Sequence, residues 1–391
     1  METKYQLILI GNKNKFARQI WLEFFKRIKE LGLNKTAVTV LDSSNFDNLY
    51  KGNSPSFCIY FGSPGGKHRD LDIVDRLLPD AKLILPIVTD LKQFKIQIPE
   101  QLRGINGFAL PDHLAIPRIV STALEGLSLL RASRRLFISY KRDESSGVAI
   151  QLFEKLEGAG FDVFLDTHSV PMAADFQEEL WHRLADTDVV VLLNTPGFLL
   201  SNWTREEVAK ANAMSIGMVQ LIWPGHKQER HSELSFPIPL KPEDFRGKKF
   251  KKSKTYLTKG TVKQVIAETE SLRARSLAAR QDNMINEFMK AAVSINASVD
   301  LQYGKFILLE KKDGKKVIVI PTVGVPQAFT YYQSEQLLNT LKLPNVVAVY
   351  LLYDHKNIRN NWIRHLDWLD LQLKIKSIKI DMVVNSLKRM I

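Results

Sequence analysis

The stretch RLFISYKRD at residues 135–143 decides the fold of the middle of the chain, because a short apolar strand runs there directly into a charged loop. Further apolar runs follow at 162–165, 189–193 and 218–223, and segments with helical periodicity separate them at 147–158, 176–184 and 204–215. Apolar strands that alternate with helices are typical of a sheet covered on both faces. We therefore predict a flavodoxin-like α/β domain with a parallel sheet over residues 133–280.

The end of this segment is predicted from its breakers and its charge. Pro224 and Gly225 end the last strand, a Pro-rich stretch follows, and a helix is predicted over 261–280. Residues 241–280 hold twelve Lys or Arg but only four Asp or Glu, and so carry most of the chain's net charge of +13. They lack the interleaved aromatic residues of a single-strand nucleic-acid groove. We expect a solvated or assembly surface here, with nucleic-acid contact as the weaker alternative.

The segment before it, residues 1–132, repeats the same alternation. Apolar runs lie at 5–11, 37–41, 57–61, 83–88 and 107–110, and a closing helix is predicted at 116–130. By the order of strands and helices this is a receiver-like α/β domain. Its loop GSPGGK at 62–67 is either an anion-binding nest or, as the looseness of the match favours, a plain glycine turn.

The last segment, residues 281–391, differs in pattern. A helix is predicted at 284–295, a hairpin across Asp313-Gly314, a helix at 331–341, a buried strand at 346–353 and a helix at 358–371. This pattern indicates an α+β or α/β domain, which we expect to act as a sensor or a partner-binding domain. Five aromatic residues in it could line a ligand pocket or, more commonly, a core: Phe329, Tyr331, Tyr332, Trp362 and Trp368.

The overall composition excludes several classes of protein. With 391 residues, 45% of them hydrophobic and 25% charged, the chain is globular and not disordered. The single cysteine, Cys58, excludes a disulfide framework and a Cys-cluster zinc site, and the eight histidines lack metal-ligand spacing. The apolar runs are far shorter than the roughly 20 residues of a membrane span. We expect a cytoplasmic protein that has no metal, no bound cofactor and no membrane contact.

Several blocks of the middle segment together resemble one known family. They are the FISY strand at 137–140, GFDVFLD at 160–166, SNWTREE at 201–207 and the closing strand that ends in Trp223-Pro224. In this order and spacing they resemble the Toll/interleukin-1 receptor (TIR) domain over residues 134–280. The resemblance implies one of two roles, an enzyme that cleaves NAD+ or a scaffold that assembles signalling partners.

In the NAD-cleaving branch of that family the catalytic glutamate lies four residues after a tryptophan. Here the tryptophan is Trp203 and the glutamate is Glu207. The chemistry suits a carboxylate, because breaking an N-glycosidic bond builds positive charge on the ribose that a nearby anion stabilises. The alternative is that Trp203 and Glu207 have a structural role at the start of a helix. The tryptophan would then pack in the core, and the helix dipole would stabilise the glutamate. Periodicity alone does not distinguish Glu207 from Glu206, and only the resemblance favours Glu207.

The resemblance also implies the rest of a nucleotide pocket. NAD+ enters it as the substrate, and the product is either ADP-ribose or a cyclic derivative. For Lys141 and Arg142 the alternative is a solvated loop, and for Phe164 it is a place in the core. The implied substrate-binding residues are Ser139, Tyr140, Lys141, Arg142, Phe164, Asp166 and Trp203.

The loop after the second strand of this segment, residues 167–175, corresponds to the loop through which TIR domains stack. Many relatives carry a glycine where this chain has Ala173-Ala174, so the conformation of the loop is not implied. In the enzymatic branch the loop helps to complete a neighbour's active site, which predicts a homo-oligomer with head-to-tail contacts, such as a filament. The implied assembly residues are Pro171, Ala173, Ala174 and Asp175.

The three-segment architecture resembles that of bacterial defence proteins in which a TIR domain is fused to sensor modules. By that resemblance we expect an NAD+ hydrolase that acts in antiviral (abortive infection) defence. An activating nucleotide or protein ligand would bind the C-terminal segment. The alternative is a TIR scaffold that assembles partners without catalysis.

Overall fold

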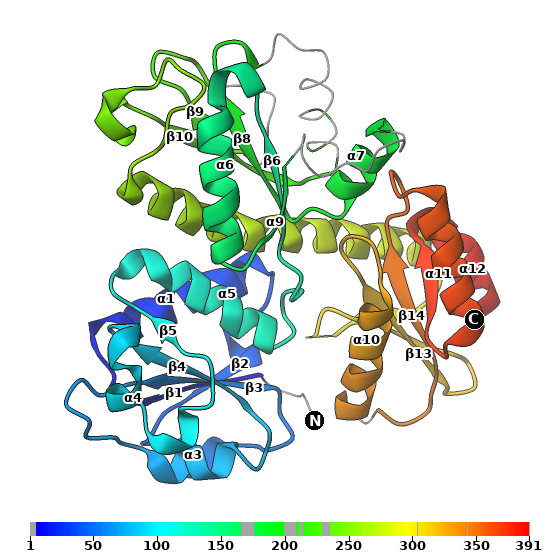
Figure 1. Ribbon diagram of the computed structural model, residues 1–391. Helices are drawn as coiled ribbons and strands as arrows, with labels where there is room; N and C mark the ends of the chain where they lie inside the picture. The colour runs from blue at the N-terminus through cyan, green and yellow to red at the C-terminus, as the bar shows by residue number, and fades with distance from the viewer. Residues whose placement is uncertain are drawn as a thin grey trace. The chain divides into compact units, whose positions relative to one another are not determined.

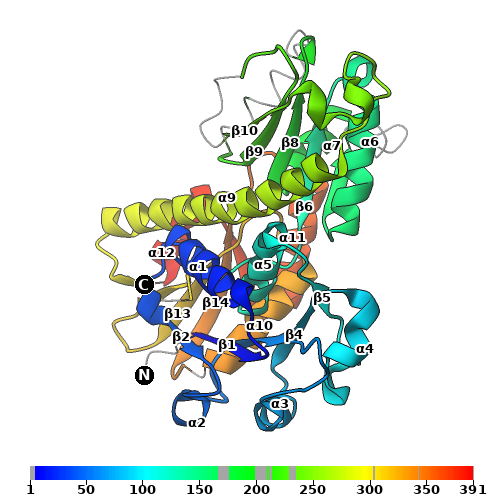
Figure 2. The same cartoon turned by 90° about the vertical axis from the view of Figure 1, so that its left-hand side faces the viewer.

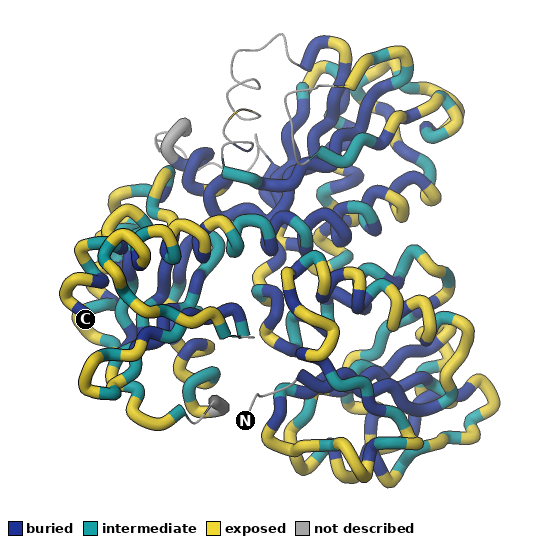
Figure 3. Tube along the Cα trace, turned by 180° about the vertical axis from the view of Figure 1, so that it is seen from behind, coloured by how far each residue is buried: buried dark blue, intermediate teal, exposed yellow. Residues whose placement is uncertain are grey.

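The computed structural model of the chain describes residues 5–165, 176–198, 209, 211, 214–228, 235–302, 304–341 and 343–390. These residues form two compact units, Met1–Ala132 and Ser133–Ile391. The first unit contains one sheet and the second contains two, each sheet with five strands (Figure 1). A tube coloured by exposure shows that most residues of the two parallel sheets are buried, as are the inward-facing residues of the helices, whereas exposed residues gather on loops and outer helix faces (Figure 3).

The first unit is the predicted α/β domain. Its parallel strands follow the order β2-β1-β3-β4-β5. They span Tyr5–Gly11 (β1), Val38–Leu41 (β2), Ser56–Phe61 (β3), Leu83–Val88 (β4) and Phe108–Ala109 (β5). The helices span Lys15–Glu30 (α1), Phe46–Leu49 (α2), Leu71–Leu77 (α3), Phe94–Gln97 (α4) and Ile116–Gly126 (α5). Helices α1 and α5 pack together on one side, and α2 and α3 contribute to the core on the other.

Two features of this unit bear on residues that the sequence analysis named. Cys58 on β3 is fully buried, and burial raises the pKa of its thiol, so it is a core residue and not a nucleophile. The GSPGGK loop makes a glycine turn, in which the N–H of Gly66 donates to the carbonyl of Ser63 over 3.0 Å and the φ of Gly66 is +69°.

The middle sheet of the chain is the predicted doubly wound sheet. Its parallel strands follow the order β10-β9-β8-β6-β7. They span Arg135–Ser139 (β6), Asp162–Leu165 (β7), Val189–Asn194 (β8), Gly217–Ile222 (β9) and Ser235–Pro239 (β10). Helices α6 (Arg142–Gly158) and α9 (Lys259–Ser294) bury their apolar side chains on one face. Helix α7 (Phe176–Ala185) packs Leu180, Trp181 and Leu184 on the other.

Strand β10 lies in the Pro-rich stretch, which the sequence pattern did not assign to a strand. It pairs only with β9, at the edge of the sheet. An edge strand leaves half of its N–H groups outside the ladder, so it tolerates the missing donors of Pro237 and Pro239.

The third sheet lies in the C-terminal part of the second unit and is mixed. Its order is β11-β12-β13-β14-β15, antiparallel up to β13 and parallel from there on. The strands span Val299–Leu301 (β11), Ile307–Glu310 (β12), Lys316–Pro321 (β13), Val346–Tyr353 (β14) and Lys376–Lys379 (β15). The helices span Ala328–Leu341 (α10), Asn360–Gln372 (α11) and Val383–Met390 (α12). The predicted hairpin is present at Gly314, whose φ is +77°.

The aromatic residues of this part differ in how far they are buried. Tyr331 is buried, and its hydroxyl donates to Asp370 over 3.0 Å. Phe329, Tyr332 and Trp368 are exposed. The interpretation of the set as a core therefore holds for Tyr331 and not for these three.

Helix α9 corrects the prediction of two helices at 261–280 and 284–295. It runs without a break for 36 residues, so the boundary predicted at 280/281 falls inside a helix (Figure 2). No Gly or Pro interrupts the helix between residues 261 and 294. Its first half buries Val262 and Val265 against the middle sheet, and its second half buries Met284 and Phe288 against the third sheet. The buried face of α9 therefore packs on a different sheet in each half, and for this reason the sequence pattern predicts two helices.

Candidate functional site

The strand order of the middle sheet brings two strand ends together. The chain leaves β6 toward β7 on one side, whereas β8, β9 and β10 extend on the other, so the order reverses between β6 and β8. Ser139, the last residue of β6, is in register with Leu192 of β8. In open α/β sheets such a switch point, at the carboxyl ends of the strands, is where ligands bind.

The first two candidate residues at this edge are buried. Tyr140 packs into the core beside Val148 of α6 and is 5% exposed. Ser139 is 2% exposed and lines a hollow of about 10 Å³ with Phe137 and Leu192. A hollow of this size, lined mostly by apolar side chains, is too small for a nucleotide group. In the described part of the structure, the side chains of Ser139 and Tyr140 are therefore buried at this edge and not open to solvent.

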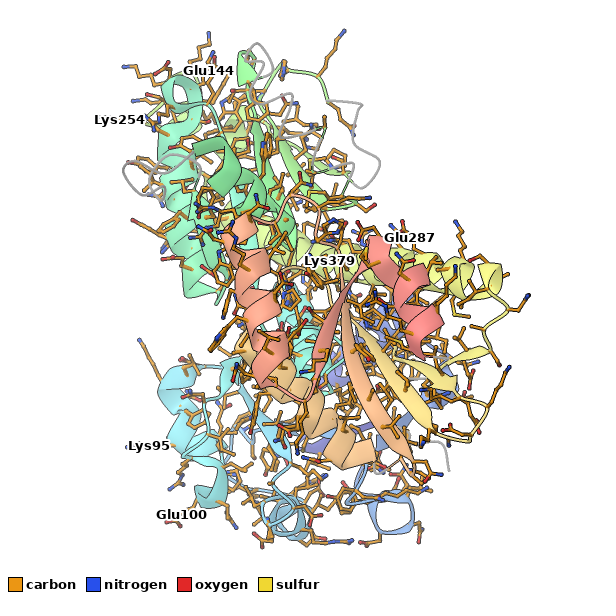
Figure 4. The ribbon with its side chains drawn as sticks, turned by 90° about the vertical axis from the view of Figure 1, so that its right-hand side faces the viewer. Lys95, Glu100, Glu144, Lys254, Glu287 and Lys379 are labelled. Atoms are coloured by element: carbon orange, nitrogen blue, oxygen red, sulfur yellow. The ribbon has the colours of Figure 1, made fainter. Side chains whose placement is uncertain are left out.

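Lys141 and Glu144 form the charged part of this edge. The Nζ of Lys141 lies 2.7 Å from Oε1 of Glu144, and the backbone N–H of Gly197 donates to Oε2 over 2.9 Å. Burial raises the pKa of Glu144, but the hydrogen bonds from Lys141 and Gly197 outweigh it and hold the pKa below its ordinary value. Glu144, in the first turn of α6, thus joins Lys141 to the loop after β8. Figure 4 labels Glu144 at this end of the TIR domain.

Sequence reasoning missed Glu144. The spacing of Lys141 and Glu144 at i,i+3 was the available signal, but the contact with Gly197 joins residues 53 positions apart. Arg142, the remaining candidate of this loop, is the first residue of α6.

Gly197 fits under the Lys141–Glu144 pair only because it has no side chain. A Cβ there would lie 2.1 Å from Oε1 of Glu144 and 2.2 Å from Nζ of Lys141. Both atoms are the far ends of flexible side chains, so Gly197→Ala should displace the pair and lower the free energy of unfolding only by the ~0.5–1.5 kcal/mol that its hydrogen bonds contribute. Thermal unfolding of the full chain measures the loss. Gly158→Ala is the matched control, because a Cβ at Gly158 meets no atom within 4 Å and alanine favours the helix; equal melting shifts for the two variants would contradict the prediction.

Residues 136–252, which include this edge, match the family model of the TIR domain. The chain carries a TIR domain. A comparison with curated proteins finds no match.

Two similar solved structures are a phosphosugar isomerase from Silicibacter pomeroyi DSS-3 and a tagatose-6-phosphate ketose/aldose isomerase from Escherichia coli. The first is 10% identical, covers 72% of this chain and 87% of its own, and has a TM-score of 0.20. The second is 13% identical, covers 73% of this chain and 83% of its own, and has a TM-score of 0.17. Scores this low carry no argument about the TIR domain.

Phe164 of the TIR domain lies in the core on the side of α7. Its ring stacks on Phe137 with centroids 5.4 Å apart, and the guanidinium of Arg183 lies 5.5 Å from its centroid. This position agrees with the alternative that the sequence offered for it, a place in the core.

The residues that the resemblance places at the centre of the chemistry lie outside the described residues, so their roles stay predictions. They are Glu207 and Trp203, the strand-end residue Asp166, and the assembly residues Pro171, Ala173, Ala174 and Asp175.

Three wider properties bear on what the TIR domain can bind. Among the described residues, no group of three or more His, Cys, Asp or Glu side chains could hold a metal ion. The described helices include none that is long and apolar enough to cross a membrane. In the basic segment, the lysines at 248, 249, 251, 252 and 254 are exposed, whereas Arg273 is buried.

Proposed function

We propose that the TIR domain cleaves the nicotinamide–ribose bond of NAD+, with Glu207 as the essential carboxylate. The observation that carries the proposal is the switch point between β6 and β8. Glu144 ties the two loops there together, and the segment that holds Trp203 and Glu207 follows the second loop in sequence.

The proposed reaction needs little beyond a well-placed anion. The bond between ribose C1′ and the pyridinium nitrogen breaks, and its electron pair goes to nicotinamide, which leaves as a neutral molecule. Water then adds at C1′ and releases a proton to give ADP-ribose; in a cyclising enzyme a nitrogen of the adenine takes the place of water. Because the leaving group needs no proton, one carboxylate beside the cationic ribose can carry the catalysis. NAD+ is the substrate, and this chemistry calls for no separate cofactor.

We further propose that turnover depends on assembly through the loop at 167–175. Asp175→Ala should then lower the rate of NAD+ cleavage and the size of the oligomer together, because the loop would complete a neighbour's site. Turnover assays run beside light scattering measure both quantities. Undiminished turnover by a strictly monomeric preparation would contradict this dependence.

The decisive test of the proposed function is nicotinamide release from NAD+ by the pure full-length protein over a range of protein concentrations, with and without a crowding agent. An assembling enzyme should show a rate that rises more steeply than its concentration. The scaffold alternative predicts no release at any concentration. The architecture supports a role as an effector of antiviral defence, in which a nucleotide or protein would activate the enzyme through the C-terminal part.

A further inference from the structure

The C-terminal part of the second unit touches the TIR domain at a second place besides α9. Glu179 of α7 pairs with Arg183 over 2.8 Å and also with Arg359, which directly precedes α11. The Glu179 side chain is only 7% exposed, and that of Arg359 is 25% exposed. The buried carboxylate of Glu179 is thus shared by two arginines, and loss of Arg359 removes one of the two cations that stabilise it.

Two further hydrogen bonds and a ring contact reinforce this pair. The N–H of Val325 donates to Oδ1 of Asp186 over 3.0 Å, and the N–H of Arg359 approaches Nδ1 of His182 at 3.5 Å. The rings of His182 and Trp362 stack with centroids 5.4 Å apart. We call this set of contacts the latch; its residues are Glu179, His182 and Asp186 on the TIR side and Val325, Arg359 and Trp362 on the C-terminal side.

The protonation state of His182 fits its place in the latch. Burial lowers its pKa to about 4. The carboxylate of Glu179 opposes this effect, and the guanidinium groups of Arg183, Arg359 and Arg135 add to it. At neutral pH the imidazole is therefore uncharged, and Nδ1 is free to accept from the backbone of Arg359.

The latch differs in kind from the attachment through α9. The first half of α9 packs into the apolar core of the TIR domain, and its second half packs into the apolar core of the C-terminal part. The latch is polar and encloses a cavity of about 120 Å³ that both parts line, among others with Arg135, Gln327 and Trp362. Polar interfaces of this kind between parts of one chain separate more easily than apolar cores do. Among the described contacts, the one through α9 is therefore apolar and the latch is the more easily separated one.

The latch also takes up the second face of α7. Leu180 and Leu184 point into the TIR core, whereas Glu179 and His182 contact the C-terminal part. Over residues 179–185, the part of α7 whose side chains the structure describes, only Arg183 is exposed. In the sequence α7 directly follows the loop predicted to mediate assembly.

We propose that the latch is an autoinhibitory contact: while the C-terminal part is seated on α7, it withholds the TIR domain from assembly, and its release permits assembly. The catalytic consequence rests on the proposed NAD+ cleavage, whereas the structural and assembly consequences do not. A partner or ligand of the C-terminal part would act by competing for the latch residues.

Charge reversal across the Glu179–Arg359 pair tests the proposal in the full-length chain. The set comprises Arg359→Glu, Glu179→Arg, the double reversal, and Arg364→Glu as the matched control, because Arg364 is exposed on the same helix. Hydrogen exchange over 176–185 reports the latch, light scattering reports assembly, and nicotinamide release reports turnover. Each single reversal should lower the protection of α7 by about tenfold or more, since it opposes like charges in a partly buried site.

The single reversals should also raise self-association and NAD+ turnover above the wild-type level, the double reversal should return all three readouts toward wild type, and Arg364→Glu should change none. Unchanged α7 protection in the single variants would overturn the latch, and loosened protection together with lower or unchanged self-association would overturn its inhibitory role. If no variant cleaves NAD+, the proposed function fails, while exchange and light scattering still decide the latch.

Discussion

Glu207→Ala should lower the turnover of NAD+ by on the order of 10²- to 10³-fold, the usual effect of removing one preorganised group that stabilises transition-state charge. The loss should appear in kcat, because the positive charge on the ribose develops only as the bond to nicotinamide breaks. Glu207→Gln should lose nearly as much, since the amide keeps the shape of the side chain but not its negative charge. Nicotinamide release under conditions that permit assembly measures all of these rates.

The matched control is Glu206→Ala, which removes the neighbouring carboxylate from the same segment. It should keep turnover within a few-fold of wild type, and both variants should melt and assemble as the wild type does. Equal losses in the two variants would remove the distinction between the two acids, and full activity of Glu207→Ala would refute its assignment. If the wild type releases no nicotinamide either, the result favours the scaffold alternative.

The parts of the fold that the sequence predicts are those whose burial is uniform. The central residues of β6 and all but the last residue of β8 are apolar because helices cover both faces of the sheet, so their runs stand out from the loops. Strand β10 was missed because its prolines are typical of loops, and only its position at the edge permits them. Helix α9 was divided in two because its buried face serves two different cores, although the absence of Gly and Pro from 261–294 was a signal that the helix continues.

The candidate site, too, could be predicted from the sequence only in part. Sequence comparison with a family can name residues such as Lys141, but their partners come from segments that strand order brings close. Glu144 meets Gly197 only because β6 and β8 are neighbours in the sheet. The latch is a stronger case, because Glu179 and Arg359 are 180 positions apart and neither lies in a recognisable motif. Ion pairs between distant segments follow from the packing of whole elements, which periodicity does not encode.

The same limit applies to the pair that fixes α9 to the TIR sheet. The Nε of Arg273 donates to Oδ2 of Asp188 over 2.7 Å, and both side chains are fully buried. A second nitrogen of Arg273 donates to the carbonyl of Ser133 over 3.1 Å. The guanidinium thus ties the middle of α9 to the residue before β8 and to the start of the second unit.

Arg273→Met should lower the free energy of unfolding of the second unit by about 3–5 kcal/mol, because it leaves the Asp188 carboxylate buried without its cation. In a unit of this size the melting temperature should fall by on the order of 10 °C. Calorimetry of the full chain measures the shift, with the first unit as an internal reference because none of its residues changes. Lys290→Met, an exposed change on the same helix, should shift the transition little.

The double variant Arg273→Met/Asp188→Leu distinguishes two contributions to the free energy of unfolding. One is the destabilisation by a buried charge that has lost its partner, and the other is the net stabilisation by the ion pair. Apolar replacements of a buried ion pair are often neutral, so the double variant should recover much of the stability that Arg273→Met loses. If the two losses instead add, the arginine stabilises the fold chiefly through its bond to Ser133 and its packing in α9. In that outcome Asp188 would not be the reason that a cation is buried at this position.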